Sequence, residues 1–152
     1  MLAERLLVPL AHDELSLSPL TEADRQALRA ACAADDHIWS IYPTSYAPDH
    51  FDRSFDMLLG NPDRLAFAVV ANGIVVGMTA YLRIQEPAQT LEIGNSYLRP
   101  DARGTGLNAM MKRLMIDHAF ACGIRRIEFR IDARHTRSQA AVRKIGTGQE
   151  GL

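Results

Sequence analysis

The chain has 152 residues, 47% of them hydrophobic and 23% charged, which suits one domain with a sizeable core. Its formal net charge of −1 favours neither nucleic acid nor an acidic membrane surface as a partner. Cys32 and Cys122 lie far apart, which fits neither a disulfide framework nor metal-ligand spacing and favours a cytoplasmic location. No stretch reaches the roughly 18 apolar residues of a membrane span, and we expect no metal site.

The first part of the chain is predicted to contain two short strands and a helix. One strand is expected around Leu6–Leu10, and a second covers residues 15–19 and ends at a proline. Thr21 can cap the helix that follows, with Asp24 three positions later as in a capping box. Alanines across residues 23–34 give this helix a high propensity.

Residues 35–48 are rich in aromatic side chains and turn formers, as in a loop or a broken helix. Trp39 and Tyr42 belong to this segment, and they either shape the pocket of a substrate or simply cover the sheet. Beyond it, the apolar spacing of residues 51–59 predicts a helix that ends at Gly60-Asn-Pro62.

Three antiparallel strands are predicted next. Arg64–Ala71 is a run of β-forming residues, and Asn72-Gly73 after it is the strongest short signal for a hairpin. Ile74–Leu82 would be the partner strand, and Leu91–Leu98 a third strand.

A turn with two glycines, Gly104 and Gly106, joins the third strand to a long helix predicted over about Thr105–Cys122 and ended by Gly123. The first amides of a helix lack intrahelical partners, the helix dipole adds positive charge there, and glycine lets a phosphate approach the backbone. Because Arg103 adds a full charge, the turn is predicted to hold a pyrophosphate.

The strand Arg126–Ile131 follows the long helix, so it should pair in parallel with the strand before the helix, as a right-handed βαβ crossover. A polar loop then leads to a short helix over Ser138–Ile145, closed by Gly146, and residues 147–152 look like the start of a strand.

The ordered set of motifs resembles the GNAT superfamily of acyl-CoA N-acetyltransferases. The set consists of the hairpin, Glu92-Ile-Gly94, Arg103-Gly-Thr-Gly106, the long helix, and Arg137-Ser138 with Lys144-Ile-Gly146. Within it, the chain looks most like the Rim-type branch of ribosomal-protein alanine N-acetyltransferases. The resemblance covers nearly the whole chain. It implies an α/β (α+β) fold in one domain, 1–152, with a mixed, mostly antiparallel central sheet flanked by helices and one βαβ crossover carrying the cofactor turn.

The resemblance implies acetyl-CoA as the cofactor. The splayed strand end at Tyr97 and Leu98 would bond the pantetheine arm, and His135 and Ser138 stand where the family has an asparagine and a serine near that arm. Asp101 should face solvent, since it would otherwise repel the pyrophosphate. The amides predicted to bind the pyrophosphate are those of Arg103, Gly104, Thr105, Gly106, Leu107 and Asn108.

Acetyl transfer to an amine needs a base, and Glu92 is the candidate, because a carboxylate beside the thioester can take a proton through a water. The alternative is a charge on an exposed strand face. Many relatives have a tyrosine, the usual candidate for the acid, where this chain has Val142, so Ser138 is the candidate here. Ser138 could equally be a helix N-cap. His118 falls on the apolar stripe of the long helix and is expected to be a satisfied core or boundary histidine.

We therefore expect an acetyl-CoA-dependent N-acetyltransferase whose acceptor is a primary amine, on a protein N-terminus or a small molecule. The alternatives are a catalytically weak or inactive acyl-CoA-binding GNAT domain and, more distantly, an unrelated nucleotide-phosphate binder. Relatives normally continue for two more strands, so the chain looks short at its C-terminus. Its open sheet edge predicts a homodimer or a poorly ordered end.

Overall fold

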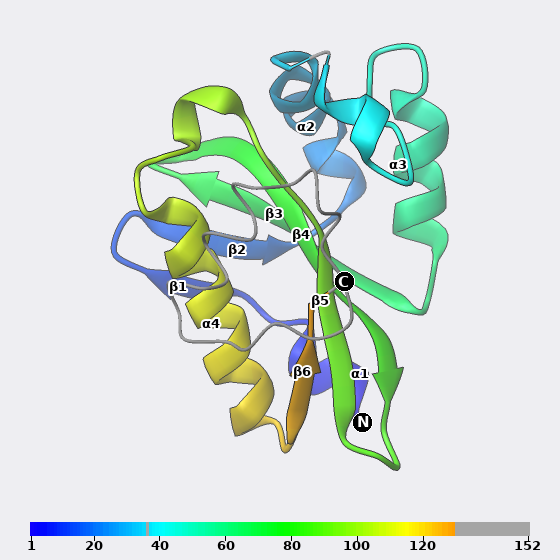
Figure 1. Cartoon of the computed structure of the whole chain (residues 1–152), viewed down its shortest axis with the longest axis vertical. Coiled ribbons are helices and arrows are strands. Elements are labelled where there is room, and N and C mark those ends of the chain that lie inside the picture. Colours follow the sequence, from blue (N-terminus) through cyan, green and yellow to red (C-terminus); the bar gives the residue numbers. More distant parts are fainter. Residues whose placement is uncertain (36, 130–152) are drawn as a thin grey trace.

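One sheet of six strands organises the protein (Figure 1). The computed structural model describes residues 1–35 and 37–129. Strands lie side by side in chain order, and each neighbouring pair is antiparallel except β5 with β6, which are parallel. This confirms the mixed, mostly antiparallel sheet. The strands are β1 (Leu10–His12), β2 (Leu15–Pro19), β3 (Arg64–Ala71), β4 (Ile74–Gln85), β5 (Thr90–Leu98) and β6 (Arg126–Glu128).

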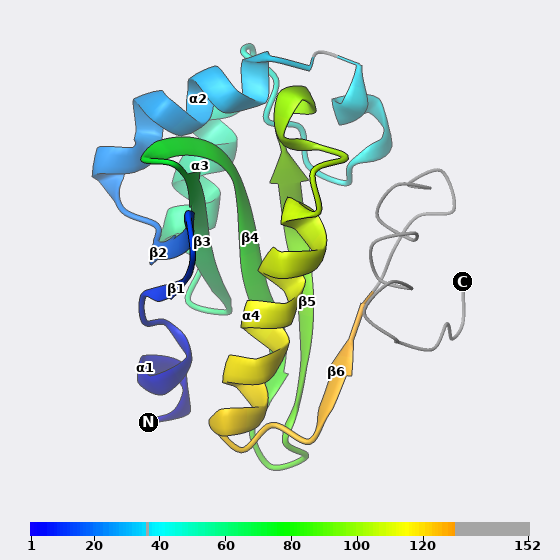
Figure 2. The same cartoon turned by 90° about the vertical axis from the view of Figure 1, so that its left-hand side faces the viewer.

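Helices pack on this sheet, with α2 and α3 side by side and α4 running along it by itself (Figure 2). None of the helices in the described ranges is both long and apolar enough to cross a membrane. The α-helices are α1 (Leu2–Leu6), α2 (Arg25–Ala33), α3 (Phe51–Gly60) and α4 (Leu107–Ala121), and the 3₁₀ turns are η1 (Glu22–Asp24), η2 (Ile38–Ile41) and η3 (Pro100–Ala102).

The two faces of the sheet carry separate hydrophobic cores. Alternate side chains of a strand point to opposite faces, and in β3 Leu65 and Phe67 join the core beneath α1 and α4, whereas Ala66 joins the core beneath α2 and α3. In β5, Leu91 and Ile93 lie on the α4 face. The residue between them, Glu92, therefore points to the α2–α3 face.

The beginning of the chain differs from its sequence-based prediction. The strand expected around Leu6–Leu10 is wrong: residues 2–6 form α1, and β1 begins only at Leu10. Leu2 and Leu6 are four residues apart, so a helix turn buries both in the α4-side core while the residues between them stay exposed. Pro9 then separates this helix from the strand.

The other elements predicted within the described residues form, with small shifts of their ends, whereas the helix predicted over Ser138–Ile145 and the strand predicted over residues 147–152 lie outside the described residues. The capping box is confirmed, because the Thr21 amide donates to Asp24 Oδ2 at 2.9 Å. The hairpin around Asn72-Gly73 is confirmed, and β4 continues to Gln85, three residues beyond the expected end. The helix after the glycine turn begins at Leu107, and Gly123 follows it with a φ of +97°.

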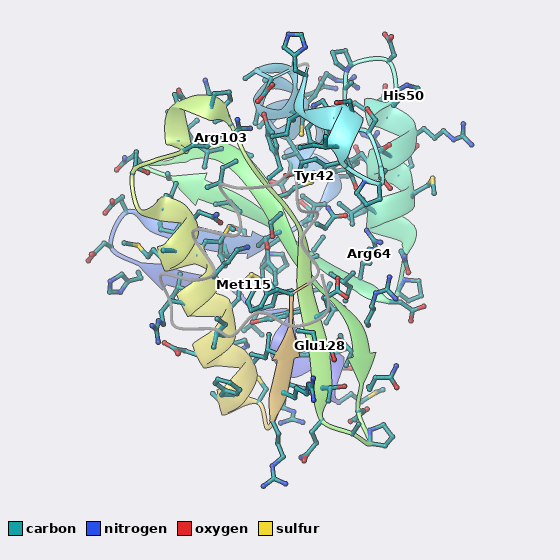
Figure 3. The ribbon with its side chains drawn as sticks, in the orientation of Figure 1. Tyr42, His50, Arg64, Arg103, Met115 and Glu128 are labelled. Atoms are coloured by element: carbon teal, nitrogen blue, oxygen red, sulfur yellow. The ribbon has the colours of Figure 1, made fainter. Side chains whose placement is uncertain are left out.

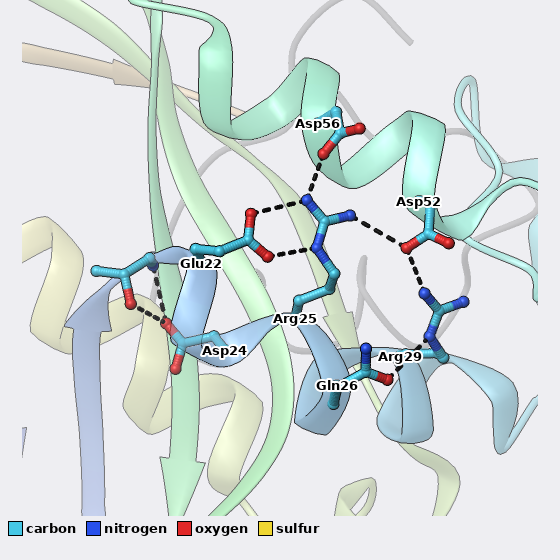
Figure 4. Close-up of polar contacts among 8 residues, drawn as sticks. Glu22, Asp24, Arg25, Gln26, Arg29, Asp52 and Asp56 are labelled. Atoms are coloured by element: carbon cyan, nitrogen blue, oxygen red, sulfur yellow. Dashed lines mark hydrogen bonds and ion pairs between the residues drawn. The ribbon is translucent and has the colours of Figure 1, made fainter.

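Ion pairs tie α2 to α3 on the surface of the protein (Figure 4). Arg25 bonds Glu22 of the preceding turn and both Asp52 and Asp56 of α3, and Arg29 also reaches Asp52. Exposed pairs each contribute little, but a network with one arginine bonded to three carboxylates fixes the relative position of the two helices. Those helices carry the aromatic segment between them.

Strands β4 and β5 approach each other very closely at Gly77. A Cβ built on this residue would lie 1.8 Å from the backbone oxygen of Tyr97. No side chain fits at such a distance, and the obstacle is backbone in the middle of a sheet. The contact therefore requires glycine.

We expect Gly77→Ala to lower the free energy of unfolding by about 3 kcal/mol or more, because the strands must separate to admit a methyl group. Gly60→Ala is the matched control: Gly60 ends α3, a Cβ there meets nothing within 4 Å, and the same change should be neutral or stabilising. Urea unfolding measures both variants. Equal stabilities would contradict the close approach.

Candidate active site

The glycine turn has the geometry of an anion site. Gly104 and Gly106 have φ values of +75° and +83°, and a Cβ on either would meet nothing within 4 Å. Thr105 Oγ1 donates back to the Ala102 carbonyl at 2.8 Å and fixes the turn. Within the described ranges, the backbone amides from Gly104 to Ala109 donate to no other group. A row of free N–H groups thus opens at the N-terminus of the 15-residue helix α4.

The Arg103 side chain does not present its charge at this turn, and that part of the prediction is wrong. Its Nη1 donates to Asp35 Oδ2 and its Nε to the Leu98 carbonyl, each at 2.8 Å, and the side chain is only 14% exposed. Burial would raise the pKa of Asp35, but the Arg103 bond and charge outweigh it and hold that pKa below its usual value. The guanidinium is thereby neutralised by a carboxylate from the loop after α2.

Asp101 faces solvent, as expected. Its side chain is 70% exposed and pairs with Arg99 at 2.7 Å. Like the Arg103 side chain, the Asp101 side chain points away from the turn, which is lined by backbone groups. Any charge complementarity for an anion here therefore comes from the helix terminus.

Glu92 is buried, which excludes the alternative of an exposed strand-face charge. The residue is 5% exposed, and its Oε1 lies 3.1 Å from Nε of Arg83 on β4. Arg83 itself has a φ of +51°, where the β4–β5 register shifts. This irregularity brings the guanidinium to the carboxylate.

A cavity of about 370 Å³ lies at the outer edge of β5. Residues 92–96 of β5 form one wall, the segment 42–46 and Arg64 form a second, and Lys112 and Phe129 form a third. Glu92 reaches the cavity from the α2–α3 face and Lys112 from α4 on the other face. The cavity therefore crosses the edge of the sheet.

Along that edge, the described residues pair with only part of β5. Residues 90–92 pair with β6, and among the described residues the rest of β5 has no strand partner on that side. A register shift opposite Met78 and a φ of +53° at Asn95 bend the strand at the same place. No described strand pairs with the backbone groups beyond Glu92 on this side.

Tyr97 and Leu98, expected at this strand end, direct their side chains into the two cores. The Tyr97 ring is buried in the α2–α3 core, and its hydroxyl donates to the Ala31 carbonyl at 2.7 Å. The Leu98 side chain lies in the other core, and its carbonyl accepts the Arg103 bond.

The two aromatic residues assigned to the acceptor pocket have different positions. Tyr42 lines the cavity, and its hydroxyl donates to the Ser96 carbonyl at 2.5 Å. Trp39 is 4% exposed, donates through Nε1 to the Cys32 carbonyl, and packs behind Tyr42 with ring centroids 4.9 Å apart. Trp39 supports the wall that Tyr42 forms.

Lys112 is a cavity residue that the sequence reasoning missed. It is 4% exposed, its Nζ lies 5.6 Å above the Phe129 ring, and desolvation lowers its pKa to about 8. None of the described carboxylates forms an ion pair with it. Lys112, Met115 and Ala119 share the spacing of one helix face, and this was the available signal.

A polar cluster beside Tyr42 was also missed (Figure 3). Arg64, which precedes the buried run of β3, donates through Nη1 to Asn95 Oδ1 at 2.6 Å. Burial raises the pKa of Tyr46, while Asn95 and the Arg64 charge oppose the rise, so the three groups lie together. All three line the cavity.

The remaining candidates lie away from the cavity or outside the described residues. His118 Nε2 is 2.8 Å from the Arg5 carbonyl at the α1–α4 contact, which confirms a satisfied boundary histidine. His135 and Ser138 lie outside the described residues, and their roles stay predictions.

Comparison with known proteins identifies the family. A family model described as an acetyltransferase (GNAT) domain matches residues 14–147. A probable GNAT-family acetyltransferase from Chromobacterium violaceum is 28% identical, with a TM-score of 0.84 over 95% of this chain and 76% of that one. A GCN5-related N-acetyltransferase from Brucella melitensis is 25% identical, with a TM-score of 0.85 over 95% and 69%.

Mycobacterium smegmatis RimJ, solved in complex with CoA-disulfide, is 20% identical, with a TM-score of 0.79 over 95% of this chain and 76% of that one. At this identity the likeness concerns the fold. No curated protein sequence matches the chain. Since the family model matches residues 14–147, which is most of the chain, the protein belongs to the GNAT family of N-acetyltransferases.

Proposed function

We propose that this protein transfers the acetyl group of acetyl-CoA to a primary amine. The observation that carries the proposal is the cavity at the open edge of β5, because a buried carboxylate, Glu92, faces it beside free strand backbone. The helix that borders the cavity begins at the open glycine turn. The anion site at the start of α4 and the base in the cavity therefore lie at two ends of the same region, bordered by α4.

The turn fits a pyrophosphate. Two left-handed glycines leave open space above the backbone, and the amides from Gly104 to Asn108 donate to no described group. These amides would hold the pyrophosphate, whereas the Arg103 amide, predicted to join them, already donates to the Pro100 carbonyl at 3.2 Å. The strand end at Tyr97 and Leu98 would hold the pantetheine arm. When bound, acetyl-CoA supplies an activated acyl thioester. The CoA-disulfide bound by the RimJ neighbour supports this choice of ligand.

Glu92 is proposed as the general base. An aliphatic amine is mostly protonated at neutral pH, with a pKa near that of lysine, about 10.4, and must lose a proton before it can attack a carbonyl carbon. The carboxylate can accept that proton directly or through a water. The Arg83 contact at 3.1 Å keeps the carboxylate in one orientation.

Lys112 adds a second titratable group to the same cavity. It approaches from the α4 face, on which the glycine turn also lies, and a pKa of about 8 lets it hold or release a proton near neutral pH. Ser138 remains the sequence-based candidate for the acid.

The first test concerns the turn. Gly106→Ala and Gly123→Ala both place a Cβ at a left-handed φ, +83° and +97°, with nothing within 4 Å, so each should cost about 1 kcal/mol of stability. CoA at a hundred times its Kd should stabilise the wild type and Gly123→Ala by about 2.7 kcal/mol. Gly106→Ala should bind CoA about tenfold or more weakly, because its methyl enters the anion space. Equal thermal shifts in the two variants would place CoA elsewhere.

The second test concerns the base. Thiol release from acetyl-CoA with a panel of amines should fall about a hundredfold or more in kcat/KM for Glu92→Gln. The thermal shift with CoA should persist. Glu86→Gln, in the exposed turn after β4, serves as the control and should keep full activity. Undiminished turnover in Glu92→Gln would remove the residue from the mechanism, and no turnover of any amine by the wild type would favour a binding module.

The third test concerns Lys112. Its pKa is lowered from 10.5 to about 8 in the folded protein, so between these values the unfolded chain binds more protons and stability should rise with pH. At pH 7, Lys112→Met should be more stable than the wild type by about 3 kcal/mol, and the difference should vanish above pH 10. Arg113→Met removes an exposed charge from the same helix and should change little. A loss of stability in Lys112→Met at pH 7 would contradict an uncompensated buried charge.

A further inference from the structure

The charges that line the cavity do not balance. Among its described lining residues there are three cations, Arg64, Arg83 and Lys112, and one carboxylate, Glu92. That carboxylate already pairs with Arg83. Arg64 and Lys112 form no ion pair with any carboxylate of the described chain, so two positive charges face the cavity without a described counter-charge.

Arg64 is the cation on the acceptor side. Figure 3 shows Arg64 and Tyr42 on the same side of the molecule. Tyr46 and Glu92 line this α2–α3 side of the cavity with them, whereas Lys112 approaches from α4. One nitrogen, Nη1, is engaged by Asn95 Oδ1 at 2.6 Å, which fixes the guanidinium without neutralising it. A guanidinium held in one place offers its remaining N–H groups as a fork that matches a carboxylate.

From these observations we infer that the acceptor is an amine that also carries a carboxylate, with the amine at Glu92 and the carboxylate at Arg64. This inference rests on the proposed acetyl transfer. It excludes polyamines and other polycationic acceptors, because two uncompensated cations in a small cavity repel them.

The position of Arg64 also limits the spacing within the acceptor. Its partner Asn95 lies three residues along β5 from Glu92, which is at most about 10 Å at 3.3 Å per residue because the strand is bent at Asn95. Both side chains reach inward over part of that span. The amine and the carboxylate of the acceptor are therefore separated by several carbon atoms rather than by one, which favours ω-amino acids and short peptides over free α-amino acids.

The experiment compares matched acceptors. The probes are 4-aminobutanoate, 5-aminopentanoate and 6-aminohexanoate, each against the alkylamine and the diamine of equal length and against glycine. Thiol release gives kcat/KM, and thermal shift of the CoA-loaded protein gives binding without turnover. We expect the ω-amino acids to exceed the alkylamines about tenfold or more, the scale of one charge-assisted bidentate pair, and the diamines to be poorest.

Three variants locate the effect. Arg64→Gln should bring the ratio of ω-amino acid to alkylamine close to one. Asn95→Asp should do the same while keeping the guanidinium, because the new carboxylate neutralises it and aspartate tolerates the φ of +53° at that position. Arg53→Gln removes an exposed arginine from α3 and should leave the ratio unchanged.

The outcomes separate this inference from the proposed function. Acetylation that favours alkylamines or diamines, or a ratio that Arg64→Gln does not change, would overturn the inference and leave acetyl transfer standing. Binding of ω-amino acids that depends on Arg64, with no turnover of any amine, would support the carboxylate site and contradict the transferase. If the ω-amino acids are neither bound nor acetylated, the carboxylate site is overturned.

Discussion

The site depends on how the backbone of β5 is paired. On one side, β4 bonds β5 so closely that only glycine fits at Gly77; on the other side, the described part of β6 pairs with β5 as far as Glu92. Buried N–H and C=O groups require partners, so a strand that is paired on one edge and open on the other offers those groups to a ligand. The φ of +53° at Asn95 turns the open portion outward. The cavity is a consequence of this interrupted pairing.

The alternation of side chains along β5 then divides the cavity between two faces. Glu92 points to the α2–α3 face, where Tyr42 and Arg64 lie, while α4 carries Lys112 and the glycine turn on the other. A donor held by the turn and an acceptor held by the aromatic segment can therefore meet at the edge without competing for the same wall. Because the proposed anion site consists of backbone amides, the side chains of the acceptor side are left to set specificity.

Most of the fold follows from local patterns in the sequence. The Asn72-Gly73 hairpin, the Thr21–Asp24 capping box and the helix after the glycine turn are short-range features, and each forms as predicted. The strand predicted around Leu6–Leu10 was wrong, because a segment of five residues is too short for its hydrophobic periodicity to distinguish a strand from one helix turn. Burial of Leu2 and Leu6 against α4, a long-range contact, decided it.

In the site, residue types could be predicted, but the partners of charged groups could not. Glu92 and the turn followed from their order in the chain, whereas the Arg103 charge was misassigned because its partner, Asp35, is 68 residues away. The same limitation hid Arg64, whose importance lies in having an amide and not a carboxylate beside it. A charge is informative about function only when its compensation is known. Arg103 is compensated within the protein, so it serves the fold; Arg64 has no carboxylate partner among the described residues, which is why we infer that the acceptor carries one.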